Sequence, residues 1–193
     1  VGDGGRGLAL VRGAVDPGGL RPRVFNPTHV NRRQALFDEA LGVASRGCTI
    51  DVTAFPVADG EDAWTAAQAL QRYQDAGLPP GNITISTDGG GCLPSFDAEG
   101  RVSRFDVGSP SALTETIREW LAMGRPLSGI LPAITSNVAA LLRLPDKGRI
   151  AVGADADLVT LDQSGNIMDV AARGRWFVRD GKPVVFGTFE RAS

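Results

Sequence analysis

Short strand-like segments alternate with longer helix-like segments over the first 144 residues of this 193-residue chain. Residues 24–25, 48–55 and 83–86 are rich in β-branched and aliphatic side chains, which is typical of strands buried on both faces. Amphipathic segments follow each of these runs and end at glycine or proline. Strands that alternate with crossover helices predict a parallel α/β sheet or barrel. Three strands alone are too few to close a barrel.

The helix boundaries follow from residues suited to helix ends. Asn31 is placed to cap the helix that follows the first strand, and Glu61 or Asp62 is placed to open the next helix. That second helix is predicted to run to Ala76, where Gly77 and a pair of prolines end it.

The pattern changes after residue 144, where short strand-like segments take over. Candidate strands lie at residues 148–153, 156–162 and 167–170, and residues 175–185 read as a hairpin. The pair Asp180-Gly181 in that hairpin favours a type I′ turn. The sequence therefore predicts two parts, residues 1–144 of α/β type and residues 145–193 as a small β module.

Composition excludes several classes of protein. The formal net charge is −2 and no basic run is present, which argues against nucleic acid as a partner. No stretch is apolar enough to span a membrane. The two cysteines, Cys48 and Cys92, lie far apart without a CxxC spacing, so we expect a reduced, cytoplasmic setting.

The strand at residues 83–86 ends in an acid followed by a glycine run, Asp88 and residues 89–91. Glycines past a strand end let a ligand approach the backbone closely. His29, the single histidine, follows an earlier predicted strand, and the carboxyl ends of parallel strands open on one face. His29 and Asp88 are therefore predicted to reach one site, where both are ordinary metal ligands. The alternatives are a structural histidine and a solvated loop carboxylate.

Three further features have both a functional and a structural interpretation. Arg32 lies one turn beyond His29, and its planar fork suits a substrate carboxylate, although a solvated helix-terminal arginine is equally compatible. Asp51, inside its strand, is either a buried polar group or a partner that supports a site residue. The glycines at 89–91 lack the Lys-Ser/Thr pair of a phosphate-binding loop.

Several stretches resemble the isoaspartyl dipeptidases (β-aspartyl peptidases) of the amidohydrolase superfamily. The stretches that resemble that family are Pro-Thr-His-Val-Asn-Arg at 27–32, Thr-Ile-Asp-Val-Thr at 49–53 and Ser-Thr-Asp-Gly-Gly-Gly at 86–91. Those at 27–32 and 86–91 are the family-specific ones. Stretches similar to the closing segment of the whole superfamily lie at 131–139, 147–150 and 153–158. The resemblance runs from Val1 to about Glu190.

The resemblance implies a (β/α)8 TIM-type barrel with two zinc ions at the carboxyl ends of its strands, followed by a small β-sandwich. Residues 1–144 would be the C-terminal part of the barrel and residues 145–193 the sandwich. His29 matches a metal-ligating histidine, and Asp88 matches an aspartate that ligates metal and shuttles the proton. Arg32 matches the arginine that holds the substrate α-carboxylate. Cys92 falls where the family has a serine that helps to bind the same carboxylate.

The implied activity is zinc-dependent hydrolysis of β-aspartyl (isoaspartyl) dipeptides by a metal-bridged hydroxide, in a homo-oligomer. The chain would be the C-terminal half of that enzyme, because the residues at 1–3 resemble those just after the third metal-ligating histidine of the family. The remaining ligands would come from a preceding half, and this half alone is expected to be inactive. Two alternatives stay open: another amidohydrolase, such as a dihydroorotase- or hydantoinase-like cyclic amidase, and a metal-free amidohydrolase-like scaffold.

Overall fold

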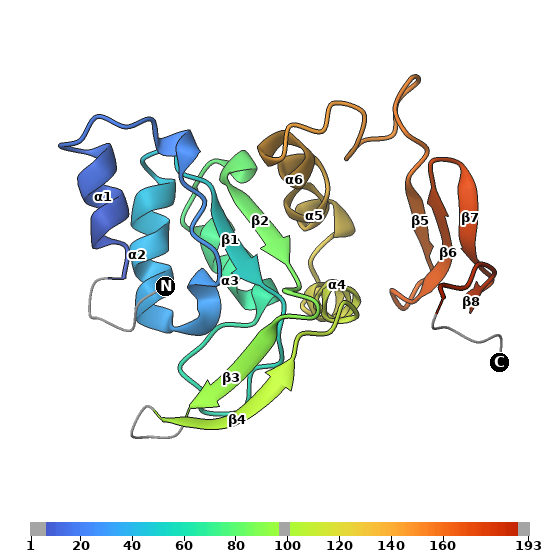
Figure 1. Cartoon of the computed structure of the whole chain (residues 1–193), viewed down its shortest axis with the longest axis horizontal. Helices are drawn as coiled ribbons and strands as arrows, with labels where there is room; N and C mark the ends of the chain where they lie inside the picture. Colours follow the sequence, from blue (N-terminus) through green and yellow to red (C-terminus); the bar gives the residue numbers. More distant parts are fainter. Residues whose placement is uncertain (1–6, 97–100, 189–193) are drawn as a thin grey trace.

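Two parallel strands lie between helices at the centre of the molecule (Figure 1). The computed structural model describes residues 7–96 and 101–188. Strand β1 (Ile50–Thr53) pairs with β2 (Ile83–Ser86) in a register that runs from Ile50↔Ile83 to Thr53↔Ser86. Helix α3 (Ala66–Asp75) crosses between them, which is the βαβ unit expected from the alternation of the sequence.

The helices bury small and aliphatic side chains against these strands. Helix α2 (Gln34–Ala44) buries Phe37 and Val43, and α3 buries Leu70 and Tyr73 in the same core. The remaining helices are α1 (Ala9–Val15), α4 (Ala112–Ala122), α5 (Leu131–Ile134) and α6 (Ser136–Leu141). Short 3-10 turns join them at η1 (Pro22–Val24), η2 (Val30–Arg32), η3 (Pro80–Asn82) and η4 (Leu127–Gly129).

The strand expected at residues 24–25 is not formed. Residues 22–24 form η1, and the chain then runs beside β1, where the Asp51 amide donates to the Pro27 carbonyl at 2.9 Å. Pro22 favours the 3-10 turn because its ring fixes φ. Pro27 has no backbone N–H and so cannot donate a hydrogen bond to a neighbouring strand. The segment at 25–29 therefore follows the direction of β1 without becoming a regular strand.

Two expected helix starts are also wrong. Helix α3 begins after Thr65, not at Glu61 or Asp62, because Thr65 and Gln68 form a capping box in which each side chain bonds the other residue's backbone amide. Asn31 does not cap α2, whose preceding residue is Arg33. The Asn31 side chain is buried and makes long-range bonds, described below.

A β-hairpin extends from this body after the glycine run (Figure 1). Strand β3 (Cys92–Phe96) pairs antiparallel with β4 (Val102–Val107). Residues 97–100, which connect the two strands in sequence, lie outside the described residues.

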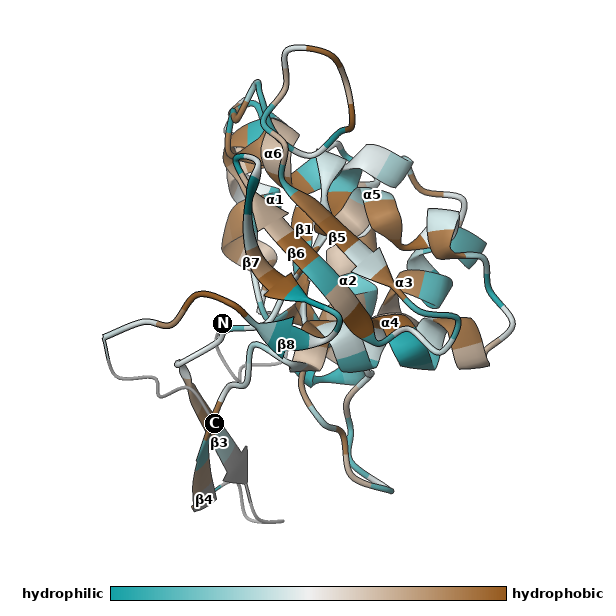
Figure 2. Cartoon of the chain, turned by 90° about the vertical axis from the view of Figure 1, so that its right-hand side faces the viewer, coloured by the Kyte–Doolittle hydropathy of each residue, from teal (hydrophilic) through white to brown (hydrophobic). Residues whose placement is uncertain are grey.

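The C-terminal part is one antiparallel sheet with the strand order β5-β6-β7-β8. Its strands are β5 (Leu158–Leu161), β6 (Ile167–Ala172), β7 (Arg175–Arg179) and β8 (Lys182–Pro183). Asp180 and Gly181 both have positive φ, as a type I′ turn requires. The sheet lies in front of the helices in Figure 2, and β5 to β7 carry apolar side chains. Arg118 of α4 donates to the Asn166 amide oxygen of the β5–β6 turn at 2.7 Å.

The strand expected at residues 148–153 is absent, because Gly148 and Gly153 at its two ends have φ of 76° and 86° and turn the chain. The described residues of the C-terminal part form a single sheet, so the sandwich and the boundary at residue 144 stay predictions. Among the described residues, no helix has both the length and the apolar character to cross a bilayer.

Candidate active site

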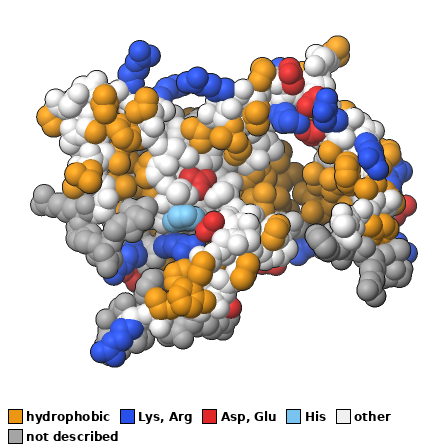
Figure 3. All heavy atoms as spheres, viewed as in Figure 1, with side chains coloured by type: hydrophobic (Ala, Val, Ile, Leu, Met, Phe, Trp, Pro, Cys, Tyr) orange, Lys and Arg blue, Asp and Glu red, His pale blue; other side chains and the backbone are white. Residues whose placement is uncertain are grey.

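Three chain segments end at the same edge of the molecule and each brings one polar side chain there. His29 ends the segment beside β1, Thr53 ends β1, and Asp88 lies two residues past β2. His29 Nδ1 and Thr53 Oγ1 are hydrogen-bonded at 2.7 Å, and His29 Nε2 lies 3.8 Å from Asp88 Oδ2. Figure 3 shows the histidine at the surface between acidic and basic side chains. The structure therefore brings together the two residues that the sequence placed at one edge.

The backbone of His29 is held in a conformation that non-glycine residues rarely adopt, with φ of 60°. Asn31 holds the turn that follows, because its amide donates to the Thr53 and Trp64 carbonyls at 2.9 and 2.8 Å. The Asn31 side-chain oxygen accepts from the Thr53 amide at 2.8 Å. The side chain of Asn31 thus bonds the Thr53 backbone N–H and C=O groups, as a neighbouring strand would do at the end of β1. Such surrounding contacts allow the unusual φ of His29 to persist.

The surroundings of His29 favour the neutral form of its imidazole. Burial, and then the charge of Arg32, lower the pKa of His29 below its ordinary value. When Nδ1 carries the hydrogen that Thr53 accepts, the lone pair of Nε2 faces Asp88. A neutral imidazole with one free nitrogen is the form that binds a metal ion.

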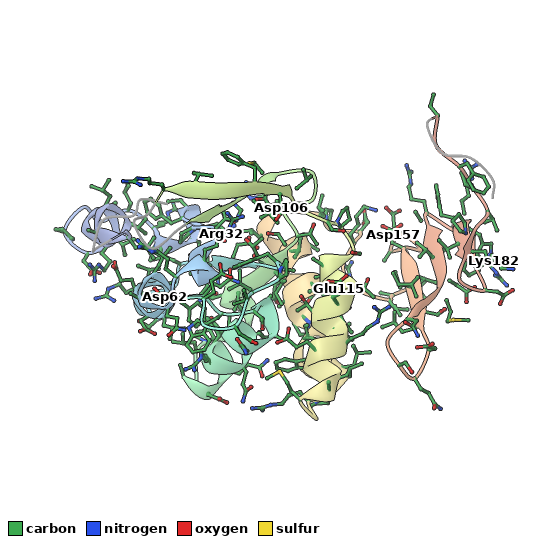
Figure 4. All side chains as sticks on the ribbon, turned by 90° about the horizontal axis from the view of Figure 1, so that it is seen from below. Arg32, Asp62, Asp106, Glu115, Asp157 and Lys182 are labelled. Carbon is green, nitrogen blue, oxygen red and sulfur yellow. The ribbon has the colours of Figure 1, made fainter. Side chains whose placement is uncertain are left out.

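Arg32 is the positive group of the site. Its Nη2 lies 3.4 Å from Asp88 Oδ2, and its guanidinium stacks over Phe55 with 5.5 Å to the ring centroid. Its Nε is buried without a hydrogen-bond partner among the described residues. A buried donor without an acceptor is costly, so this nitrogen is suited to an anionic ligand. Arg32 and Asp106 are both labelled in Figure 4, close to the β3–β4 hairpin.

Two of the glycines near Asp88, Gly91 and Gly108, leave no room for a side chain. Asp88 has φ of 49°, and its carbonyl accepts from the Gly91 amide at 2.8 Å. A Cβ at Gly91 would lie 2.4 Å from Asp88 Oδ1, and one at Gly108 would lie 2.3 Å from the Asp88 carbonyl oxygen. Gly108 also donates to the Gly91 carbonyl at 2.8 Å, which ties β4 to the loop. The glycine run therefore shapes the loop that carries Asp88.

Substitution of Gly108 by alanine should displace Asp88. The added methyl group meets rigid backbone, so we expect a loss of about 1–3 kcal/mol in the free energy of unfolding, as for overpacked sites, and a clear loss of any activity that needs Asp88. Gly13→Ala is the control, since nothing lies within 4 Å of its Cβ position in α1. Thermal unfolding of both variants measures the difference; equal stability would contradict the contact.

A cavity of about 320 Å³ adjoins Arg32 beneath the hairpin. Apolar walls come from Phe55 and Leu93, and carboxylates of Asp106 and Glu115 also line it. It is large enough to receive part of a small zwitterionic molecule. No local sequence pattern predicts this cavity, because residues of the β3–β4 hairpin and residues near Arg32, distant in sequence, line it together.

Comparison with known proteins places the chain in a family. Residues 43–185 match the amidohydrolase family. The chain belongs to this family. The amidohydrolases include the β-aspartyl dipeptidase of Fervidobacterium islandicum AW-1, whose structure in complex with a β-Asp-Leu dipeptide is 38% identical, with a TM-score of 0.86. A second structure of that dipeptidase is 35% identical, with a TM-score of 0.81.

Both matches cover 98% of this chain but only 48% and 47% of the dipeptidase chains. The chain thus spans about half the length of these relatives. A D-hydantoinase shares the fold at 17% identity and a TM-score of 0.55, over 82% of this chain and 45% of its own. Membership of the amidohydrolase family implies a TIM-barrel-type hydrolase fold, with which the βαβ unit is consistent.

His29 and Asp88 form a pair of possible metal donors at the site. His29 Nε2 and Asp88 Oδ2 face each other, and their residue types suit zinc. The described residues contain no group of three or more His, Cys, Asp or Glu side chains that could hold a metal ion. A metal ion at this pair would need further ligands from outside the described residues.

Cys92 opens β3, opposite Val107, and its thiol is exposed. Its expected contact with a substrate carboxylate stays a prediction. Two residues to which no sequence motif assigned a role complete the site: Thr53 orients the imidazole, and Phe55 packs against Arg32. Their positions depend on contacts between segments that are distant in sequence, and local sequence patterns do not predict such contacts.

Proposed function

We propose that this chain is part of a zinc-dependent hydrolase that cleaves β-aspartyl (isoaspartyl) dipeptides. The observation that carries the proposal is the convergence of His29, Arg32 and Asp88 beside a cavity, in a chain 38% identical to a β-aspartyl dipeptidase. In this proposal residues 1–144 belong to the barrel and residues 145–193 to a small β-sandwich. The rest of the barrel, and assembly into a homo-oligomer, are parts of the same proposal.

His29 and Asp88 would hold zinc in the proposed site. Two zinc ions would supply an activated water near neutral pH and polarise the scissile carbonyl. The Thr53 hydroxyl keeps the imidazole ring of His29 oriented through Nδ1, so that Nε2 stays available as a ligand.

Asp88 would carry the proton. Its carboxylate accepts the proton of the attacking water and then donates it to the nitrogen of the leaving amino acid, as a general base and then a general acid. Arg32 Nη2, 3.4 Å from Asp88 Oδ2, would hold this carboxylate in position before the reaction.

Arg32 would also select the substrate. An isoaspartyl residue keeps a free α-carboxylate beside the scissile bond, and a guanidinium binds such a group with two parallel hydrogen bonds. Its unpartnered Nε is suited to one of them. In the same proposal Cys92 lies near this carboxylate, where a thiol is a weaker donor than a hydroxyl.

Metal removal from the full-length protein tests this proposal. Chelation should abolish hydrolysis of β-Asp-Leu, and added zinc should restore it. Hydantoin and dihydroorotate, assayed in parallel, should remain uncleaved. Hydrolysis of the cyclic amides alone would favour a cyclic amidase, and a protein that neither binds zinc nor hydrolyses any of these substrates would favour a metal-free scaffold.

A further inference from the structure

A buried carboxylate links the three segments that form the candidate site. Asp51, in the middle of β1, is only 6% exposed. Its Oδ2 accepts hydrogen bonds from Thr28 Oγ1 at 2.8 Å and from Ser86 Oγ at 2.7 Å. Its Oδ1 accepts from Thr84 Oγ1 at 2.7 Å. Three hydroxyl groups from two neighbouring segments therefore converge on one side chain of β1.

The core alone does not explain this carboxylate. Burial of a charged group is unfavourable unless hydrogen bonds replace its water, and a valine or isoleucine at this position would suit a buried strand better. Asp51 stands between Ile50 and Val52, both fully buried. Unlike an aliphatic side chain, the carboxylate forms directed hydrogen bonds to both neighbouring segments, the one that precedes His29 and strand β2.

The bonded hydroxyl groups lie next to the site residues along the chain. Thr28 directly precedes His29, and Ser86 lies two residues before Asp88. Asp51 itself lies two residues before Thr53, which bonds His29 Nδ1. One carboxylate thus connects the ends of all three segments at the point where each delivers a side chain to the site.

We propose that Asp51 is a positioning residue, which fixes the separation of His29 and Asp88 through the hydroxyl groups of Thr28 and Ser86. The inference rests on the proposed function, because it assigns Asp51 a role at the metal site of that reaction. Hydrogen-bonded partners behind metal ligands orient the ligands and tune metal affinity. Asp51 acts here through the segments that bear the ligands, and does not touch the substrate.

The first test is Asp51→Asn in the full-length protein, a change that keeps the size of the side chain. One carboxylate oxygen becomes an NH2 group, which cannot accept from a hydroxyl donor. We expect zinc affinity, measured by competition with a chelator, to fall roughly 10–100-fold. We expect kcat for β-Asp-Leu to fall with it at saturating zinc, while KM stays within about twofold, since substrate binding by Arg32 is untouched.

Two isosteric variants separate positioning from general destabilisation. Thr28→Val removes the bond beside His29, and Thr84→Val removes a bond of similar length to the same carboxylate. Thr84 pairs with Asp51 itself, two register pairs before the Thr53↔Ser86 pair that ends the strands. Both variants should lower the unfolding temperature of the metal-free protein to a similar extent, but only Thr28→Val should weaken zinc binding, by about tenfold.

The outcomes distinguish this inference from the proposed function. Equal zinc affinity in the wild-type protein and in Thr28→Val, with β-Asp-Leu hydrolysis intact, overturns the role of Asp51 alone. Equal loss of zinc affinity in Thr28→Val and Thr84→Val also overturns it, because the effect then follows stability. A wild-type protein without zinc binding or hydrolysis overturns the proposed function and this inference together. If Asp51→Asn fails to fold, the pair of threonine variants still decides.

Discussion

The Asp88→Asn variant of the full-length protein should retain its fold and lose turnover of β-Asp-Leu by about a hundredfold or more, the range expected when a general acid–base group is removed. The amide matches the carboxylate in shape, so the glycine-lined loop around residue 88 is undisturbed. It cannot accept and return a proton at neutral pH. The kcat at saturating substrate and zinc is the quantity to measure.

The zinc content of the same variant separates the two roles given to Asp88. If the variant retains zinc but has a low kcat, the proton-transfer role of Asp88 is supported. If it loses zinc, the metal-ligand role is supported. Asp146→Asn is the matched control, since Asp146 is exposed and lies outside the site. Near-normal turnover by Asp88→Asn would remove Asp88 from the catalytic step.

The Arg32→Lys variant should mainly raise the KM for β-Asp-Leu, by roughly tenfold to a hundredfold, because a charged hydrogen bond contributes about 1.5–3 kcal/mol. A lysine keeps the positive charge beside Asp88 but replaces the planar fork with a point charge. It also removes the stacking of the guanidinium over Phe55. We expect kcat to change less, since Arg32 binds the carboxylate in the ground state and the transition state alike.

Steady-state kinetics of Arg32→Lys beside Arg12→Lys provide the comparison. Arg12 pairs with Glu39 at 3.6 Å, away from the site, so its replacement controls for the chemical change itself. An unchanged KM in Arg32→Lys would remove Arg32 from the substrate site.

The sequence predicted the parts of the fold that depend on local pattern. The β-branched runs at β1 and β2 and the crossover helix between them follow from periodicity alone, as does the Asp180-Gly181 turn. The start of α3 was missed although Thr65 and Gln68 form a readable capping box, because acidic residues upstream offered a competing signal.

The parts that failed depend on competition between local and distant partners. Asn31 is a good cap by type, but its amide is buried against Thr53 and Trp64, a choice that only the folded chain decides. Pro22 and Pro27 prevented a regular strand before His29, yet the segment still follows β1. Because this segment runs alongside β1, the sequence could predict that His29 and Asp88 lie together, although the strand expected before His29 is not formed.

The cleavage of β-Asp-Leu, compared with α-Asp-Leu, by the zinc-loaded full-length protein is the most direct test of the account. The two dipeptides have the same composition and differ in which carboxyl group forms the peptide bond. We expect a kcat/KM for β-Asp-Leu at least about a hundredfold higher, since only the β isomer leaves the α-carboxylate of its aspartyl residue free to bind Arg32. Equal cleavage of the two isomers, or cleavage of the α isomer alone, would contradict it.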